Sequence, residues 1–162
     1  MIRILTVLAA IAALAGCASK FRTYDGPAVT RLILLKQERK LHLMHNDTAL
    51  RSYDVGLGFA PEGHKRQEGD GRTPEGDYVI DRRNPDSEFH LSIGISYPNA
   101  EDIARAEAAG RDPGSDIFIH GRPWPYILGG RDWTAGCIAV SNREIEEIYA
   151  MVRDDTPITI LP

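Results

Sequence analysis

Short apolar runs, broken by polar or glycine-rich turns, recur from residue 29 to the end of the chain. The first three are Val29–Lys36, Leu41–Met44 and Leu50–Gly56, and the polar clusters between them are typical of tight turns. We therefore expect an antiparallel meander of short strands. Four later runs also have the composition of strands, at residues 78–80, 89–96, 117–120 and 158–160.

Segments with the pattern of a helix are fewer than the runs that predict strands. Asn99 can cap a short helix over Ala100–Ala109, which Gly110 would end. Ser141 and Glu144 form a capping-box pattern, in which each side chain bonds the other residue's backbone N–H. Apolar residues then follow at helical spacing, namely Ile145, Ile148, Tyr149 and Val152. The chain is thus expected to form a mainly β domain with a few short helices.

The first residues indicate export. Arg3 is followed by an apolar run over 4–15, which is shorter than the roughly 20 residues that a membrane-spanning helix needs. Leu14-Ala15-Gly16-Cys17 resembles a bacterial lipobox, in which the cysteine is lipidated; an ordinary signal peptide with an incidental cysteine is the alternative. We expect a lipoprotein signal peptide over 1–16, a tether over 17–27 and one folded domain over 28–162.

The charge and the cysteine content limit the classes of partner and of function that we expect. After loss of the signal peptide, the chain would carry 18 basic and 23 acidic side chains with no basic block, which disfavours a nucleic-acid partner. The two cysteines are Cys17 and Cys137, so lipidation of Cys17 leaves Cys137 without a disulfide partner. An unpaired thiol in an oxidising compartment is either a small buried hydrophobe or a functional group.

The strongest chemical signal joins His120-Gly121, at the end of a predicted strand, to Thr134-Ala135-Gly136-Cys137. A cysteine can act as a nucleophile and a histidine as its general base. The backbone N–H groups of Gly136 and Cys137 are candidates for an oxyanion site. A nearby imidazolium, or aligned backbone amides, would lower the pKa of the thiol.

These segments resemble the YkuD-type L,D-transpeptidase catalytic domain, a cysteine class of peptidoglycan-modifying enzymes. The resemblance covers residues 28–162 and also includes the element Gly69-Asp70-Gly71-Arg72-Thr73-Pro74-Glu75-Gly76. Residues 89–99 are similar to the ErfK/YafK-like subgroup. The resemblance implies a YkuD-like β-sandwich, with Cys137 as the nucleophile and His120 as the general base.

The chain departs from the family pattern at three positions. Gly121 has no side chain that could orient His120, so a backbone carbonyl must do so. Ala135 replaces a frequent histidine, and Ala139 replaces a frequent arginine that would hold a substrate carboxylate. Arg72, Arg131 and Arg122 are the substitutes we consider for that arginine, against the alternative that each is a solvated surface charge.

Other substrate-binding candidates are His90, Gly121 and Trp133. His90 either lines the cleft or is a hydrogen-bonded structural residue, and Trp133, with Trp124 and Tyr126, either walls the cleft or packs its loop. His42 and His45 lack the acidic or cysteine cluster that a metal site would need, so no metal ligands are assigned. The expected chemistry requires no metal or organic cofactor.

The resemblance implies an acyltransferase that forms a thioester with the carbonyl of a diaminopimelate-type residue in a peptidoglycan stem peptide. An amine would then accept the acyl group. Alternatives are an L,D-carboxypeptidase or amidase that hydrolyses the same thioester, with a wall-attached protein as acceptor or substrate, and a non-catalytic lipoprotein that binds wall peptides. A lipid on Cys17 would place the domain in the cell envelope facing the periplasm. Ala18 favours the outer membrane over the inner one.

Overall fold

The computed structural model describes residues 19–128 and 130–162. The predicted signal peptide and the lipidation residue Cys17 lie outside the described residues. The described part of the predicted tether forms neither helix nor strand, and it lies against the last helix, where Arg22 Nη2 contacts Glu146 Oε2 at 2.7 Å. Within the described residues, none of the helices has the length and apolar character to cross a bilayer.

The predicted meander is confirmed. Strands β1 (Arg31–Leu35), β2 (Lys40–His45) and β3 (Thr48–Asp54) pair antiparallel in sequence order. Alternate residues of β1 and β2 point inward, because successive side chains of a strand face opposite sides, and Leu32, Leu34, Leu41 and Leu43 are fully buried.

The last strand of the chain lies in the middle of the sheet. Strand β8 (Pro157–Leu161) runs parallel to β1 and antiparallel to β4 (Gly76–Asn84). The sheet then continues through β5 (Ser92–Ile95), β6 (Phe118–His120) and β7 (Ile138–Ala139). The order of the eight strands is β3-β2-β1-β8-β4-β5-β6-β7.

This sheet curls until its two edges touch. The chain just beyond β3 bonds to β7, with Gly56 and Ala139 exchanging two backbone hydrogen bonds of 2.8 Å. A side chain at Gly56 would collide with the Arg131 carbonyl, so the close approach requires glycine. Both halves of the curled sheet contribute to one apolar core, which confirms the expected mainly β, sandwich-like fold.

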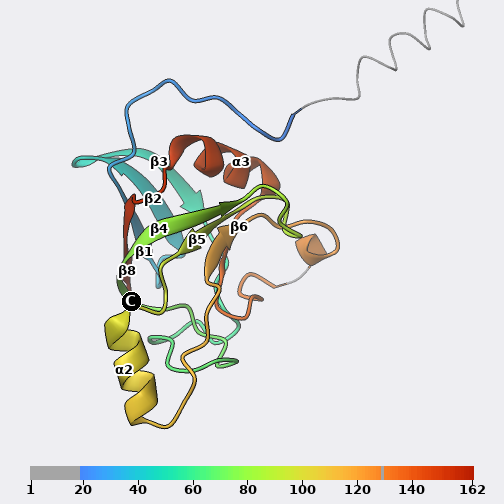
Figure 1. The fold of residues 1–162 in the computed structure, drawn as a ribbon. Helices are drawn as coiled ribbons and strands as arrows, with labels where there is room; N and C mark the ends of the chain where they lie inside the picture. Colours follow the sequence, from blue (N-terminus) through green and yellow to red (C-terminus); the bar gives the residue numbers. More distant parts are fainter. Residues whose placement is uncertain (1–18, 129) are drawn as a thin grey trace, which may run out of the picture.

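Two short helices lie at opposite ends of the sheet (Figure 1). Helix α2 (Ala100–Ala108) is capped by Asn99, and α3 (Asn142–Met151) begins with the predicted capping box of Ser141 and Glu144. Ile145 and Ile148 of α3 are fully buried in the core.

One predicted strand is shorter than expected. The apolar run over 89–96 forms a strand only over Ser92–Ile95. His90 has a φ of 77°, in the left-handed region that a strand does not tolerate. Residues 85–91 therefore form a loop beside the sheet, and this loop contributes to the site described next.

Candidate active site

Strands β6 and β7 bring Cys137 and His120 to one cavity. Ile119 pairs with Ile138 in parallel register, so Cys137 lies beside Phe118. His120 is two residues beyond Phe118 and points to the same side of the sheet. The two side chains line a cavity of about 260 Å³, together with Asn84, Ser87, Glu88, Phe89, Ser92, Asp116 and Phe118. The structure thus brings to one cavity the two residues that the sequence pattern predicts as nucleophile and base.

The carbonyl of Gly121 orients His120. His120 Nδ1 lies 2.7 Å from that oxygen and donates to it, which leaves Nε2 as the basic nitrogen. A side chain at Gly121 would lie 2.6 Å from Asn142 Oδ1 and 2.7 Å from the Phe89 carbonyl oxygen. Gly121 is therefore required for packing, and its role is to position the histidine through its backbone.

Aromatic rings hold the other faces of the imidazole. The Phe89 ring lies 4.4 Å from the His120 ring, and Trp133 meets it edge-on at 5.8 Å between centroids. Tyr126 stacks on Trp133 at 4.5 Å. Trp133 thus packs against His120 and Tyr126 packs against Trp133, whereas Trp124 is 70% exposed. The sequence pattern did not identify Phe89 as part of the site. No local pattern could indicate its contact with His120, because the tertiary fold brings its loop over that ring.

Backbone groups surround the sulfur of Cys137. The Phe118 N–H donates to Sγ at 3.4 Å, and Sγ donates to the Asp116 carbonyl at 3.4 Å. Of the two amides expected to bind an oxyanion, that of Gly136 donates to Thr134 Oγ1 at 3.2 Å. For Cys137 N–H, no partner is present in the described part of the chain, so it is the more available donor.

Burial makes the neutral forms of both reactive groups the more stable ones. Removal from water raises the pKa of the Cys137 thiol, and this effect outweighs the Phe118 N–H, which lowers it. Burial likewise lowers the pKa of His120, despite the bond to the Gly121 carbonyl. These two directions favour the neutral thiol and the neutral imidazole, and a thiol with a lowered pKa stays a prediction for the site.

The structure does not bring the other candidates into this cavity. His90 Nε2 lies 2.9 Å from Glu146 Oε1 on α3. Arg131 contacts Asp54 at 3.2 Å and lines a separate hollow beside Val55. Arg72 lines another surface hollow with Asp70 and Arg111, and only its backbone approaches Gly136.

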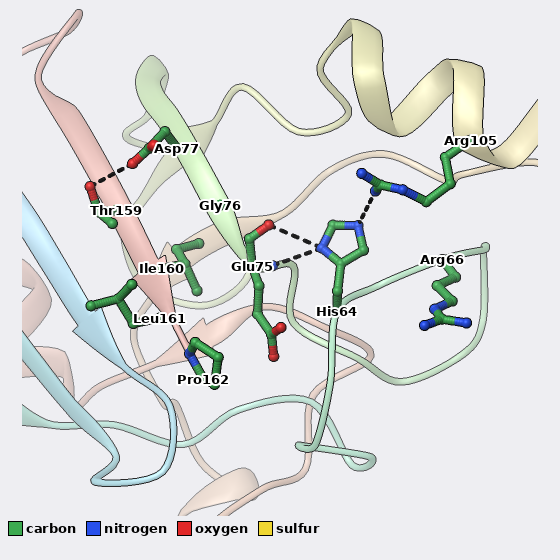
Figure 2. Close-up of a pocket in the computed structure, with 10 residues that line it drawn as sticks. All are labelled: His64, Arg66, Glu75, Gly76, Asp77, Arg105, Thr159, Ile160, Leu161 and Pro162. Carbon is green, nitrogen blue, oxygen red and sulfur yellow. Dashed lines mark hydrogen bonds between the residues drawn. The ribbon is translucent and has the colours of Figure 1, made fainter.

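A larger hollow of about 460 Å³ lies beside α2 and contains His64 (Figure 2). His64 Nδ1 lies 3.0 Å from both the backbone N and O of Glu75, and Nε2 lies 2.8 Å from Arg105 Nη1 and 3.1 Å from Asp102 Oδ1. Within residues 19–128 and 130–162, no group of three or more His, Cys, Asp or Glu side chains is arranged to hold a metal ion.

Comparison with known proteins identifies a family and a fold for this chain. Residues 30–160 match the family model of the L,D-transpeptidase catalytic domain, YkuD. The chain is 31% identical over 126 residues to YafK of Escherichia coli K12, provisionally named an L,D-transpeptidase. This match covers 74% of the chain but 45% of that relative, so the chain spans about half the length of the curated relatives it matches.

Solved structures show the same fold. The helical cell shape determining protein Pgp2 from Campylobacter jejuni superposes with a TM-score of 0.62 at 22% identity, over 91% of this chain and 52% of Pgp2. An L,D-transpeptidase from Mycobacterium smegmatis gives a TM-score of 0.57 at 16% identity, over 83% of this chain and 59% of that one.

Proposed function

The chain belongs to the L,D-transpeptidase catalytic domain family, and from this premise we propose that it is a cysteine acyltransferase acting on peptidoglycan stem peptides. The observation that carries the proposal is the shared cavity of Cys137 and His120, with Nδ1 of the imidazole bonded to the Gly121 carbonyl. This arrangement leaves an imidazole with a free ring nitrogen and a thiol lining the same cavity. Acyl transfer needs such a pair.

The first half of the reaction forms a thioester. His120 Nε2 takes the proton of the Cys137 thiol as the sulfur attacks the carbonyl of a diaminopimelate-type residue. The new S–C bond places negative charge on the carbonyl oxygen, which the Cys137 N–H can bind. The oxyanion then collapses, the C–N bond breaks, and His120 returns its proton to the departing amine of the terminal D-amino acid.

The second half transfers the acyl group. An acceptor amine attacks the thioester carbonyl and loses a proton to His120, and the S–C bond breaks to regenerate the cysteine. The lowered pKa of His120 suits this sequence, because it favours the neutral imidazole, which can accept a proton in each half-reaction. Dividing one amide exchange into two steps lowers the barrier of each.

The proposal places the domain at the cell envelope. A lipid on Cys17 would attach it to a membrane facing the periplasm, with the outer membrane favoured by Ala18. Residues 18–21 lie between Cys17 and Arg22, whose guanidinium contacts Glu146 of α3 at 2.7 Å. Radiolabelled palmitate incorporation in wild type and in Cys17→Ala tests the anchor, which is excluded if wild type remains unlabelled.

Product analysis tests the reaction. We would incubate the purified domain with disaccharide-tetrapeptide and separate the products by mass spectrometry. Cross-linked dimers with released D-alanine support transfer to an amine. Tripeptide without dimers supports hydrolysis of the same thioester and would replace the transferase proposal with a carboxypeptidase. If a wall-attached protein is the acceptor or substrate, its peptide conjugate would be formed or cleaved when that protein is added to the assay.

A further inference from the structure

The active cavity contains acidic side chains but no lysine or arginine among the residues that line it. Glu88 and Asp116 are its two acids, and Glu88 has no ion pair or hydrogen bond to any side chain in the described ranges. Ala139 occupies the position where the family often has a carboxylate-binding arginine. The cation for a substrate carboxylate must therefore come from elsewhere in the fold.

Strand register supplies such a cation from β4. Arg82 pairs with Gly94 of β5, and Gly94 pairs with Phe118 of β6, so the three residues form one row across the sheet. Gly94 leaves space above β5, because a Cβ there would lie 2.8 Å from Arg82 Nε. The Arg82 side chain crosses this space, and its guanidinium carbon lies 4.6 Å from the Phe118 ring centroid.

The row of Arg82, Gly94 and Phe118 ends beside Cys137, the proposed nucleophile. The Phe118 N–H donates to Cys137 Sγ, and Arg82 Nη2 lies 3.4 Å from Asp116 Oδ1. Asp116 lines the cavity, and its carbonyl oxygen accepts from Cys137 Sγ. Asp116 has a φ of 60°, a left-handed conformation that aspartate adopts more readily than most residues. The positive charge of Arg82 also lowers the pKa of Cys137, in agreement with its position near the sulfur.

From this arrangement we infer that Arg82, with Asp116 and Glu88, forms a subsite for a zwitterionic amino-acid head group beside Cys137. The guanidinium binds the carboxylate, and the two acids bind the ammonium. The inference rests on the proposed function, since the free end of a diaminopimelate side chain carries one ammonium and one carboxylate.

The contacts of Arg82 leave room for such a ligand. Nη1 is held by Asp81 at 2.8 and 2.9 Å, whereas the Nη2 contact with Asp116 is longer, at 3.4 Å. The Asp116 side chain is 75% exposed, so this contact contributes little and can be exchanged for a substrate. A carboxylate can then bind the Nη2 and Nε edge of the guanidinium in a bidentate manner.

The test compares two acyl donors that differ only in the carboxylate. One tetrapeptide carries diaminopimelate and the other carries lysine, which keeps the ammonium but lacks the distal carboxylate. We expect wild type to prefer the diaminopimelate donor, and Arg82→Met to lower kcat/KM for that donor by about 10- to 100-fold with little change for the lysine donor. Glu88→Gln should lower kcat/KM for both donors, because both carry the ammonium.

Arg51→Met is the matched control, because Arg51 lies exposed on β3 and, among the described residues, its side chain bonds only the neighbouring Leu50 carbonyl. Equal losses on both donors in Arg82→Met, or no loss on either, would overturn the inference. Thermal unfolding and Cys137 alkylation of the variant would show whether an equal loss comes from damage to the fold or the nucleophile.

Calorimetry of free meso-diaminopimelate with Cys137→Ser, with and without Arg82→Met, separates this inference from the proposed function. If Arg82→Met weakens that binding but wild type turns over neither donor, the subsite is supported and the acyltransferase is refuted. If wild type turns over the diaminopimelate donor but Arg82→Met changes neither binding nor rate, the acyltransferase is supported and the subsite is refuted.

Discussion

Two hollows of this domain each contain a histidine, and the one with the cysteine that we propose as the nucleophile is the smaller of the two. The hollow beside α2 has a volume of about 460 Å³, whereas the cavity of His120 and Cys137 measures about 260 Å³. In the larger hollow both ring nitrogens of His64 contact polar groups of Glu75, Arg105 and Asp102, as Figure 2 shows in part. In the smaller one, Nδ1 of His120 is bonded to Gly121 while the thiol shares the cavity.

The two hollows differ in whether a histidine nitrogen is left free to exchange a proton, and their volumes do not reveal this difference. The His64 contacts tie the loop over 58–74 to α2 and to the start of β4, which is a structural task. The His120 contacts fix the ring and still leave a nitrogen to move protons. The predictions below test the two hollows one at a time.

Removing the reactive groups has the largest expected effect. Cys137→Ala and His120→Ala should each lower the rate of stem-peptide turnover by about a thousandfold or more, because the nucleophile or its base is lost. His64→Ala should keep the turnover per folded molecule close to that of wild type. Unchanged wall chemistry in Cys137→Ala would eliminate both the transferase and the hydrolase and leave a wall-peptide-binding lipoprotein.

A methyl group at Gly121 should damage the smaller hollow through packing. Gly121→Ala places a Cβ against Asn142 Oδ1 and the Phe89 carbonyl, so we expect a loss of about 1–3 kcal/mol in the free energy of unfolding. Turnover should also fall, because the displaced carbonyl no longer orients His120. Urea unfolding and steady-state rates measure the two effects. Gly130→Ala is the control, since no atom lies within 4 Å of a Cβ there; equal stability of the two variants would contradict the packing role.

His64→Ala should weaken the larger hollow without changing the chemistry. The buried Asp102 carboxylate loses one neighbour but keeps Arg105 at 3.1 Å and the Tyr78 hydroxyl at 2.9 Å. We therefore expect a loss of about 1–2 kcal/mol in the free energy of unfolding, measured by urea titration. A large fall in kcat at unchanged stability would instead assign a reactive role to this hollow.

The pH dependence should be the most modest effect. Since the pKa of Cys137 lies above its ordinary 9.0, less thiolate is present at pH 7, and iodoacetamide should alkylate it no faster than a free cysteine peptide. The alkylation rate should still be rising at pH 9. Because the pKa of His120 lies below its ordinary 6.5, the acid limb of kcat/KM should have its midpoint below that value. Rapid labelling at pH 6 would show a preformed thiolate instead.

Much of the fold was predictable because it depends on local patterns. The alternating apolar residues of β1 and β2 define their buried face, and capping residues such as Ser141 and Asn99 define where helices begin. The pair of His120 and Cys137 was also predictable from residue type and context. His90 shows the limit of this approach: its left-handed backbone ended a predicted strand early and directed the side chain to Glu146.

The sequence by itself determined the strand and helix content and the family, and it predicted the pair of residues that the proposed function uses. Only the tertiary structure decided that β8 lies between β1 and β4, that the Gly121 carbonyl orients the base, and that Arg82 crosses Gly94 toward the sulfur. The physical reason is range: caps and apolar periodicity act between residues close in sequence, whereas strand order and the row from Arg82 to Phe118 arise from pairing between distant segments. The desolvation of Cys137 also arises from distant segments, because the pKa of its thiol depends on what the whole fold packs around it.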